Sequence, residues 1–313
     1  MTFALRALLT AAAALLLVTA CTPRLPPVDR AELKPKTAAE LQKYVVTREP
    51  DVDVFRARGP FRVTVHENHE LRLAPKEIYR GDLFAAGLTG PAPLVIILHG
   101  YDSSKAAHYH QAVHLASWGM HAMTVALPPK GPWSNNGRIL ARIVSAIHAS
   151  PELMPAQIDR DRIIMVGFSF GATAVAVALA QGAPAAGGIF LDPAAIGKGL
   201  PQLMRRIDKP VLVIGADEEV SSTRNREYFY DFIRSTIAEV SIRGAAHEDG
   251  QYPSDEAIRT GSDPNTTEDL QIAFAAALTS AALSLAATGG FDYAWETFGP
   301  ALQSGRFINA RKR

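Results

Sequence analysis

The 313-residue sequence contains a single cysteine, Cys21, and has no excess of charge of either sign. One cysteine excludes an intramolecular disulfide and the cysteine-rich kinds of structural zinc site. The 32 Lys and Arg residues nearly balance the 31 Asp and Glu residues, so no global field would attract nucleic acid. Internal repeats are also lacking. These absences leave a globular protein whose length suits one large α/β domain.

Long apolar runs are scarce, and the clearest one lies at the N-terminus. Arg6 precedes an apolar stretch over residues 7–20, which is shorter than the roughly 20 residues that span a bilayer. The segment Val18-Thr-Ala-Cys21 resembles a bacterial lipobox, in which the cysteine is lipidated after cleavage. We expect residues 1–20 to be a lipoprotein signal peptide and Cys21 to carry a lipid. An ordinary secretory signal or a signal anchor is the alternative.

The expected lipid anchor places the protein in the cell envelope. Thr22 follows the cysteine, where inner-membrane lipoproteins commonly have Asp, so an outer-membrane or periplasmic location is compatible if the host has an outer membrane. Residues 21–52 are polar and contain prolines, which predicts a flexible tether with one short helix over residues 37–44. Residues 53–313 are expected to fold as one domain.

Strand-like and helix-like patterns alternate through this domain. Strands are expected near residues 61–66, 71–83, 93–98, 121–127, 163–166, 187–191, 210–215 and 238–242. Helices are expected near residues 105–118, 136–149, 172–181, 223–237 and 268–287. Repeated β-α units predict an α/β fold with a mostly parallel, doubly wound sheet of about eight strands.

Two further segments are interpreted from composition. Residues 272–287 are apolar but short for a membrane span and carry Thr279, Ser280 and Ser284, so we expect a helix packed on the sheet. The basic C-terminus, with Arg306 and residues 311–313, is expected to be a solvated tail.

One stretch joins a strand pattern to a helix pattern through the sequence G-x-S-x-G. Residues 163–166 are typical of a strand buried on both faces, and residues 172–181 lack Pro and Gly, which favours a helix. Between them lie Gly167, Ser169 and Gly171, the arrangement of a nucleophile elbow. In such a turn the serine takes a positive φ, and each glycine removes a Cβ that would crowd the backbone. The alternative is an ordinary turn with an N-cap serine.

A serine hydroxyl is a weak nucleophile and needs a general base that is oriented by an acid. With a nucleophile elbow, the expected chain order is Ser, then Asp or Glu, then His. All histidines but His247 precede Ser169, so His247 is the expected base. The acid is expected just beyond the next-to-last strand. Asp217 is our first choice, Glu218 the second, and Asp192 at the end of the preceding strand the third.

Two backbone N–H groups are expected to bind the oxyanion of a tetrahedral intermediate. One belongs to Phe170, directly after the serine, and the other to Tyr101 in the H-G-x turn that follows the strand over residues 93–98. The Tyr101 ring is expected to line the substrate site, with a plain surface aromatic as the alternative. Trp133 lies in a loop after a parallel strand and either contacts substrate or packs the loop.

His108, His110 and His114 form the pattern H-x-H-x-x-x-H on a predicted helix. A zinc site would need further ligands, and neither cysteines nor a nearby carboxylate cluster supplies them. We therefore expect a hydrated face of an amphipathic helix and no metal site.

From about residue 61 to residue 287 the chain resembles the α/β-hydrolases, in the branch that contains dienelactone hydrolases, chlorophyllases, platelet-activating-factor acetylhydrolases and bacterial polyester hydrolases. The resemblance is carried by Leu98-His-Gly-Tyr101, Leu115-Ala-Ser-Trp-Gly119, Gly167-Phe-Ser-Phe-Gly171, Gly215-Ala-Asp217 and Ala246-His247. It implies the α/β-hydrolase fold and hydrolytic chemistry, without naming a substrate. Dienelactone hydrolases proper use a cysteine nucleophile, where this chain has serine. Only residues 192–209 stand where lidded relatives insert a cap, so no large cap domain is expected.

These features predict an exported, lipid-anchored serine esterase that hydrolyses carboxylic esters through an acyl-enzyme, without a metal or organic cofactor. The expected partners are a small-molecule or polymeric ester substrate and a membrane, and not nucleic acid. The same residues could pass the acyl group to another acceptor or cleave an amide, as an acyltransferase, amidase or peptidase does. A non-catalytic binding lipoprotein on the same fold is the remaining alternative.

Overall fold

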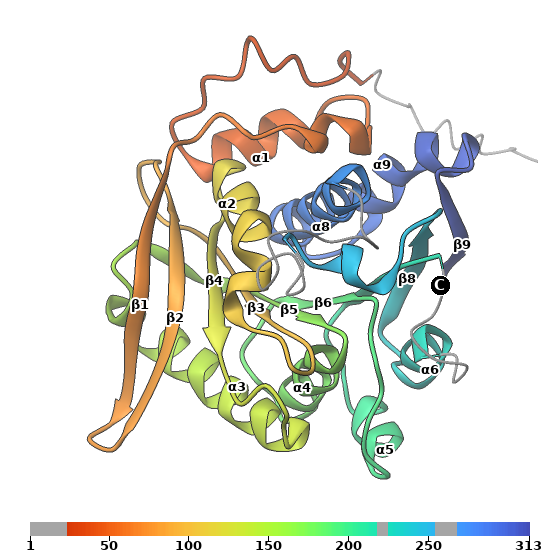
Figure 1. The fold of residues 1–313 in the computed structure, drawn as a ribbon. Helices are drawn as coiled ribbons and strands as arrows, with labels where there is room; N and C mark the ends of the chain where they lie inside the picture. Colours follow the sequence, from red (N-terminus) through yellow and green to blue (C-terminus); the bar gives the residue numbers. More distant parts are fainter. Residues whose placement is uncertain (1–23, 218–224, 254–267) are drawn as a thin grey trace, which may run out of the picture.

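The computed structural model describes residues 24–217, 225–253 and 268–313. The expected signal peptide over residues 1–20 and the expected lipidated Cys21 lie outside these ranges. Within them, nine strands form one sheet in the order β1-β2-β4-β3-β5-β6-β7-β8-β9 (Figure 1). The strands are β1 (Val63–Ala74), β2 (Glu77–Ala86), β3 (Ala92–Leu98), β4 (His121–Ala126), β5 (Ile158–Phe168), β6 (Gly187–Leu191), β7 (Val211–Gly215), β8 (Thr236–Ile242) and β9 (Phe307–Lys312).

The six central strands of the sheet run parallel. Strand β3 pairs in parallel with β4 and β5, and β5, β6, β7 and β8 continue in the same direction. The outer strands β1, β2 and β9 pair antiparallel with their neighbours. The predicted α/β fold with a mostly parallel sheet is confirmed. The sheet has nine strands where about eight were expected, because the C-terminal residues add β9 beside β8.

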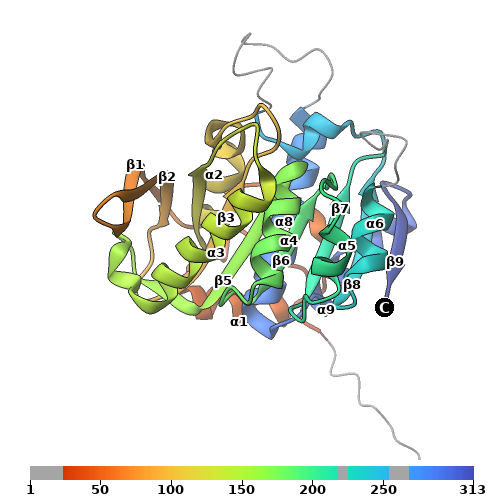
Figure 2. The same ribbon diagram turned by 90° about the horizontal axis from the view of Figure 1, so that it is seen from below.

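Helices cover both faces of the sheet (Figures 1 and 2). One face carries α1 (Ala38–Val46), α2 (Tyr109–Ser117), α8 (Glu268–Thr288) and α9 (Asp292–Gln303). The other carries α3 (Trp133–Ala149), α4 (Phe170–Ala180), α5 (Leu200–Met204) and α6 (Asn225–Phe232). Short 3-10 helices are η1 (Val52–Arg56), η2 (Lys105–His108), η3 (Pro151–Leu153) and η4 (His247–Gly250). Only α5 lies between β6 and β7, where a cap domain would be inserted.

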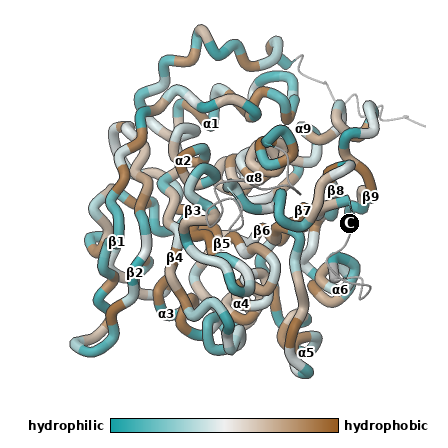
Figure 3. The backbone as a smooth tube through the Cα atoms, viewed as in Figure 1, coloured by the Kyte–Doolittle hydropathy of each residue, from teal (hydrophilic) through white to brown (hydrophobic). Residues whose placement is uncertain are grey.

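The two hydrophobic cores follow from strand geometry. Successive side chains of a strand point to opposite faces, so a strand that is covered on both sides must be apolar throughout. In β5, Ile163 and Met165 belong to the core under α3 and α4, while Ile164 and Val166 belong to the core under α8. Apolar residues accordingly concentrate in the central strands, and the tip of the β1–β2 hairpin is hydrophilic (Figure 3).

Helix α8 is the most apolar long helix of the fold. Of the described helices, it alone is long and apolar enough to cross a membrane, but 83% of its apolar window is buried inside the protein. It contacts strands β5, β6, β7 and β8. The expected helix packed on the sheet is therefore present.

The short helix expected over residues 37–44 of the tether is present as α1, but it packs on the core of the domain. Helix α1 begins after the N-cap Thr37, whose side chain and that of Glu40 form a capping box. Leu41 and Val45 are fully buried in the core against α8. The folded domain therefore starts upstream of residue 53, because an amphipathic helix in this polar stretch supplies part of the core.

The expected solvated tail at the C-terminus is also wrong. Arg311 lies in β9 and forms an ion pair with Glu239 of β8. Burial raises the pKa of the Glu239 carboxyl. Arg306 makes a two-point ion pair with Asp53, at 2.7 and 2.9 Å. Arg306, Arg311 and Lys312 are thus ion-paired, because the terminal strand closes the edge of the sheet beside β8.

Candidate active site

Ser169 occupies a strained turn between β5 and α4. Its φ of 53° and ψ of −126° place it at the N-cap of α4. A Cβ on Gly167 would lie 2.6 Å from Cα of Ala172, and one on Gly171 would lie 2.5 Å from the carbonyl oxygens of Leu98 and His99. Both glycines are therefore required for the turn, as the G-x-S-x-G spacing predicts.

The backbone around Ser169 joins the elbow to β6. The Ser169 N–H donates to the Leu191 carbonyl at 3.1 Å, and the Ser169 carbonyl accepts from the Ala194 N–H at 3.0 Å. The serine also sits at the positive end of the dipole of α4, where negative charge is stabilised. The end of β6 is thus held directly against the elbow.

His247 contacts Asp192, which follows β6. Nδ1 of His247 lies 2.6 Å from Oδ2 of Asp192. The Asp192 side chain is only 2% exposed, and its Oδ1 accepts a hydrogen bond from the Ala216 N–H at 2.9 Å. A buried carboxylate with these two partners fixes the imidazole and leaves Nε2 free to accept a proton.

The choice of Asp217 as the acid that orients His247 is therefore corrected to Asp192. Oδ2 of Asp217 accepts from the Gly244 N–H at 2.7 Å, and the Asp217 N–H donates to the Ala245 carbonyl at 2.9 Å. The second choice, Glu218, lies outside the described residues. The reason is strand order: β6 is the immediate neighbour of β5, whereas β7 is one strand further from the elbow.

Phe168 links the imidazole to the elbow. The rings of Phe168 and His247 stack with centroids 4.6 Å apart, so the imidazole lies beside the residue that precedes Ser169. Within the described part of the chain, the Ser169 hydroxyl makes no hydrogen bond, and so none to His247. Catalytic hydrogen bonds of free enzymes are often long and shorten when substrate binds.

A second layer of polar contacts holds the loop that carries His247. Gln111 of α2 accepts from Nδ1 of His108 at 2.6 Å and donates to the Gly250 carbonyl at 3.0 Å. The Tyr252 N–H donates to the Ala107 carbonyl at 2.8 Å. Sequence reasoning missed Gln111 and Phe168. Phe168 stands inside the elbow motif, but no sequence signal marks Gln111.

The two expected oxyanion donors belong to residues next to Ser169 or next to a residue that packs on it. Gly100 packs directly on Ser169, because a Cβ there would lie 2.8 Å from the serine Cβ. The next residue, Tyr101, contacts Phe170 edge-on with ring centroids 6.3 Å apart. Neither the Tyr101 N–H nor the Phe170 N–H donates to an acceptor among the described residues. Both amides are therefore available to a ligand at the serine.

The aromatic residues expected to touch substrate differ in exposure. Tyr101 is 54% exposed, as a residue that lines an open site would be. Trp133 is 4% exposed and packs against His99 and Phe170 at the start of α3. The expectation that Trp133 contacts substrate is thus replaced by its alternative, packing beneath the rim.

The expected hydrated face of His108, His110 and His114 is wrong for two of its three members, while His110 is half-buried. His108 and His114 are buried, and burial lowers the pKa of each to about 4. His114 Nε2 lies 2.7 Å from the Phe55 carbonyl, which packs η1 against α2. His114 is buried because η1 packs over α2, and His108 is buried because its ring packs against Phe168. No group of three His, Cys, Asp or Glu side chains suited to a metal occurs in the residues that the structure describes.

Comparisons with known proteins do not assign the chain to a family. No protein-family model matches the sequence, and the search of curated proteins gives no significant match.

Proposed function

We propose that this protein is a serine hydrolase with an α/β-hydrolase fold that cleaves carboxylic esters. The observation that carries the proposal is the contact of His247 with the buried Asp192 beside a strained serine turn. Strain of this kind costs free energy and is found where function requires it. A structural serine would need neither the positive φ nor the carboxylate-bound imidazole.

In the proposed mechanism, the Ser169 hydroxyl attacks the acyl carbon while Nε2 of His247 takes its proton. Asp192 holds the imidazole in the tautomer that leaves Nε2 free and stabilises the imidazolium that forms. The Tyr101 and Phe170 amides bind the oxyanion. His247 then returns the proton to the leaving alkoxide. Water activated by the same imidazole hydrolyses the acyl-enzyme.

Hydrolysis of p-nitrophenyl acetate and butyrate tests this proposal. The wild-type protein should release p-nitrophenol, and Ser169→Ala should lower kcat by about 10⁴-fold or more while circular dichroism stays unchanged. A folded wild-type protein with no turnover of either ester would favour the binding-protein alternative. Product analysis in the presence of alcohols would separate hydrolysis from acyl transfer.

The proposed location rests on the lipobox resemblance of Val18 to Cys21. We infer an exported protein that is anchored to a membrane by a lipid on this cysteine. Cys21→Ser, expressed in a host with lipoprotein processing, should move the protein from the membrane fraction to the soluble fraction. Retention of the variant in membranes would contradict the anchor.

A further inference from the structure

A cavity lies away from Ser169, between η1, α8 and the adjoining ends of β8 and β9. Its volume is about 340 Å³. Its apolar lining includes Val52, Ile242, Ala273, Ala276 and Phe307, all of them buried. This volume falls within the roughly 300–1,000 Å³ that is usual for small-molecule sites. The cavity contains none of the residues assigned to the serine site.

Three arginines and two aspartates also line this cavity. Arg306 is paired with Asp53, and Arg56 is paired with Asp269. Arg243, the third arginine, has only a neutral partner: its Nε donates to the Gly305 carbonyl at 2.5 Å. In the described part of the chain, its two terminal nitrogens contact no carboxylate. The cavity lining thus carries one uncompensated positive charge.

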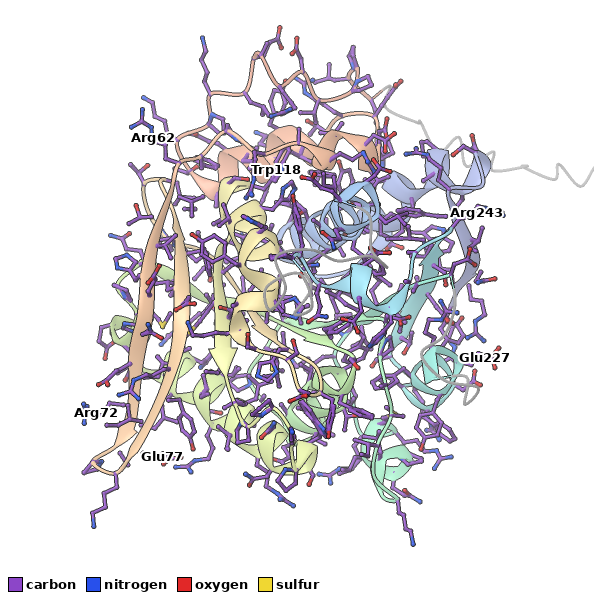
Figure 4. The ribbon with its side chains drawn as sticks, viewed as in Figure 1. Arg62, Arg72, Glu77, Trp118, Glu227 and Arg243 are labelled. Atoms are coloured by element: carbon purple, nitrogen blue, oxygen red, sulfur yellow. The ribbon has the colours of Figure 1, made fainter. Side chains whose placement is uncertain are left out.

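The position of Arg243 suits a ligand at the cavity mouth. It follows β8 and lies beside α9 and β9 at the edge of the molecule (Figure 4). Gly305 lies beside the guanidinium, since a Cβ there would be at ordinary contact distance, 3.6 Å, from a terminal nitrogen of Arg243. Small residues, Ala273, Ala276 and Ser304, line the same space. The Gly305 carbonyl therefore holds the guanidinium at Nε, whereas the two terminal nitrogens have no partner among the described residues.

We propose that this cavity binds an amphipathic monocarboxylate, with the carboxylate on Arg243 and the apolar body against α8 and Phe307. A guanidinium pairs with a carboxylate through two parallel hydrogen bonds, and such charge-assisted bonds are the stronger kind. The single uncompensated charge selects a monoanion, and the apolar lining selects a hydrocarbon chain or ring. This site does not depend on the proposed hydrolase function.

Calorimetric titration with octanoate tests the proposal on the whole folded protein, with 1-octanol as the matched uncharged probe. Octanoate should bind with a Kd on the order of 1 mM. 1-Octanol should bind at least about 10-fold more weakly, because it lacks the charge. Arg243→Gln should weaken octanoate binding by about 10-fold, and Arg243→Lys should restore part of the loss. Ala273→Leu, which fills the cavity, should weaken both probes.

Ser169→Ala separates this cavity from the serine site. It should bind octanoate as the wild type does, because Ser169 does not line the cavity. Loss of octanoate binding in Ser169→Ala with retention in Arg243→Gln would place the ligand at the serine and overturn the proposal. Equal binding of octanoate and 1-octanol, or no binding of octanoate, would overturn it as well. If Arg243→Gln does not fold, Ala273→Leu provides the test. Unchanged octanoate binding by Ala273→Leu would contradict the proposed site.

Discussion

Nδ1 of His247 and Oδ2 of Asp192 lie 2.6 Å apart, which joins the loop after β8 to the end of β6. The two residues are 55 positions apart in the sequence and meet beside the turn that holds Ser169. Because β5 and β6 are paired neighbours, Asp192 at the end of β6 lies close to the elbow at the end of β5, where the His247 imidazole stacks on Phe168. This contact favours Asp192 over Asp217 as the acid that orients His247.

Exchange of the two aspartates for asparagine tests that decision. Asp192→Asn should lower kcat for p-nitrophenyl esters by about 10⁴-fold, because the amide favours the wrong tautomer of His247. Asp217→Asn is the matched control and should cost less than about 10-fold, because among the described residues the Asp217 side chain accepts a hydrogen bond from the Gly244 N–H and makes none with His247. The opposite order of losses would return the role to Asp217.

Alanine at the elbow glycine should destabilise the fold. Gly171→Ala places a Cβ 2.5 Å from two carbonyl oxygens that belong to the backbone and cannot swing away. We expect a loss of about 2 to 4 kcal/mol in the free energy of unfolding, measured in urea. Gly199→Ala at the N-cap of α5 is the control: its φ of −92° is open to alanine, nothing lies within 4 Å of the new Cβ, and a change of less than about 1 kcal/mol is expected. Equal effects of the two changes would contradict the packing of the elbow.

Gln111 is expected to act as a positioning residue for the loop that carries His247. Gln111→Leu removes its hydrogen bonds to His108 and to the Gly250 carbonyl. We predict a kcat lower by about 10- to 100-fold with little change in KM, because the imidazole is displaced and the substrate surface is not. The pH profile of kcat/KM should shift as well. An unchanged kcat and pH profile in the folded variant would leave Gln111 with a structural role only.

Acid should destabilise the protein partly through His114. Burial lowers its pKa to about 4, below the ordinary value of 6.5, so the unfolded chain binds the proton more readily. The contribution of this group is intact above pH 6.5 and is lost as the pH falls toward 4. His114→Gln keeps a donor for the Phe55 carbonyl. Between pH 7 and pH 5, the free energy of unfolding of this variant should therefore fall by about 2 kcal/mol less than that of the wild type. Parallel stability curves for the two proteins would contradict this.

The features that sequence reasoning predicted best are those with local causes. The elbow follows from two glycines that flank one serine, and β3 and β5 follow from unbroken apolar runs. Position in the chain also selected His247. Each of these depends on neighbours in sequence or on chain order.

The errors concern contacts between distant segments. Asp192 and Asp217 both follow a parallel strand, and only the spacing of the folded strands separates them. Arg311 looks like a tail residue until β9 pairs with β8 and brings it to Glu239. His114 looks exposed until the N-terminal segment covers α2. Sequence patterns describe what each segment prefers, and these contacts depend on which segments pack together.

Labelling with a fluorophosphonate probe tests the central claim most directly. A phosphonate traps a serine only when a nearby base activates it, and the adduct can be located by mass spectrometry of peptides. The wild-type protein should be labelled stoichiometrically at Ser169, and Ser169→Ala should not be labelled. Asp192→Asn should be labelled much more slowly than the wild type. A folded wild-type protein that the probe leaves unmodified at Ser169 would contradict the account.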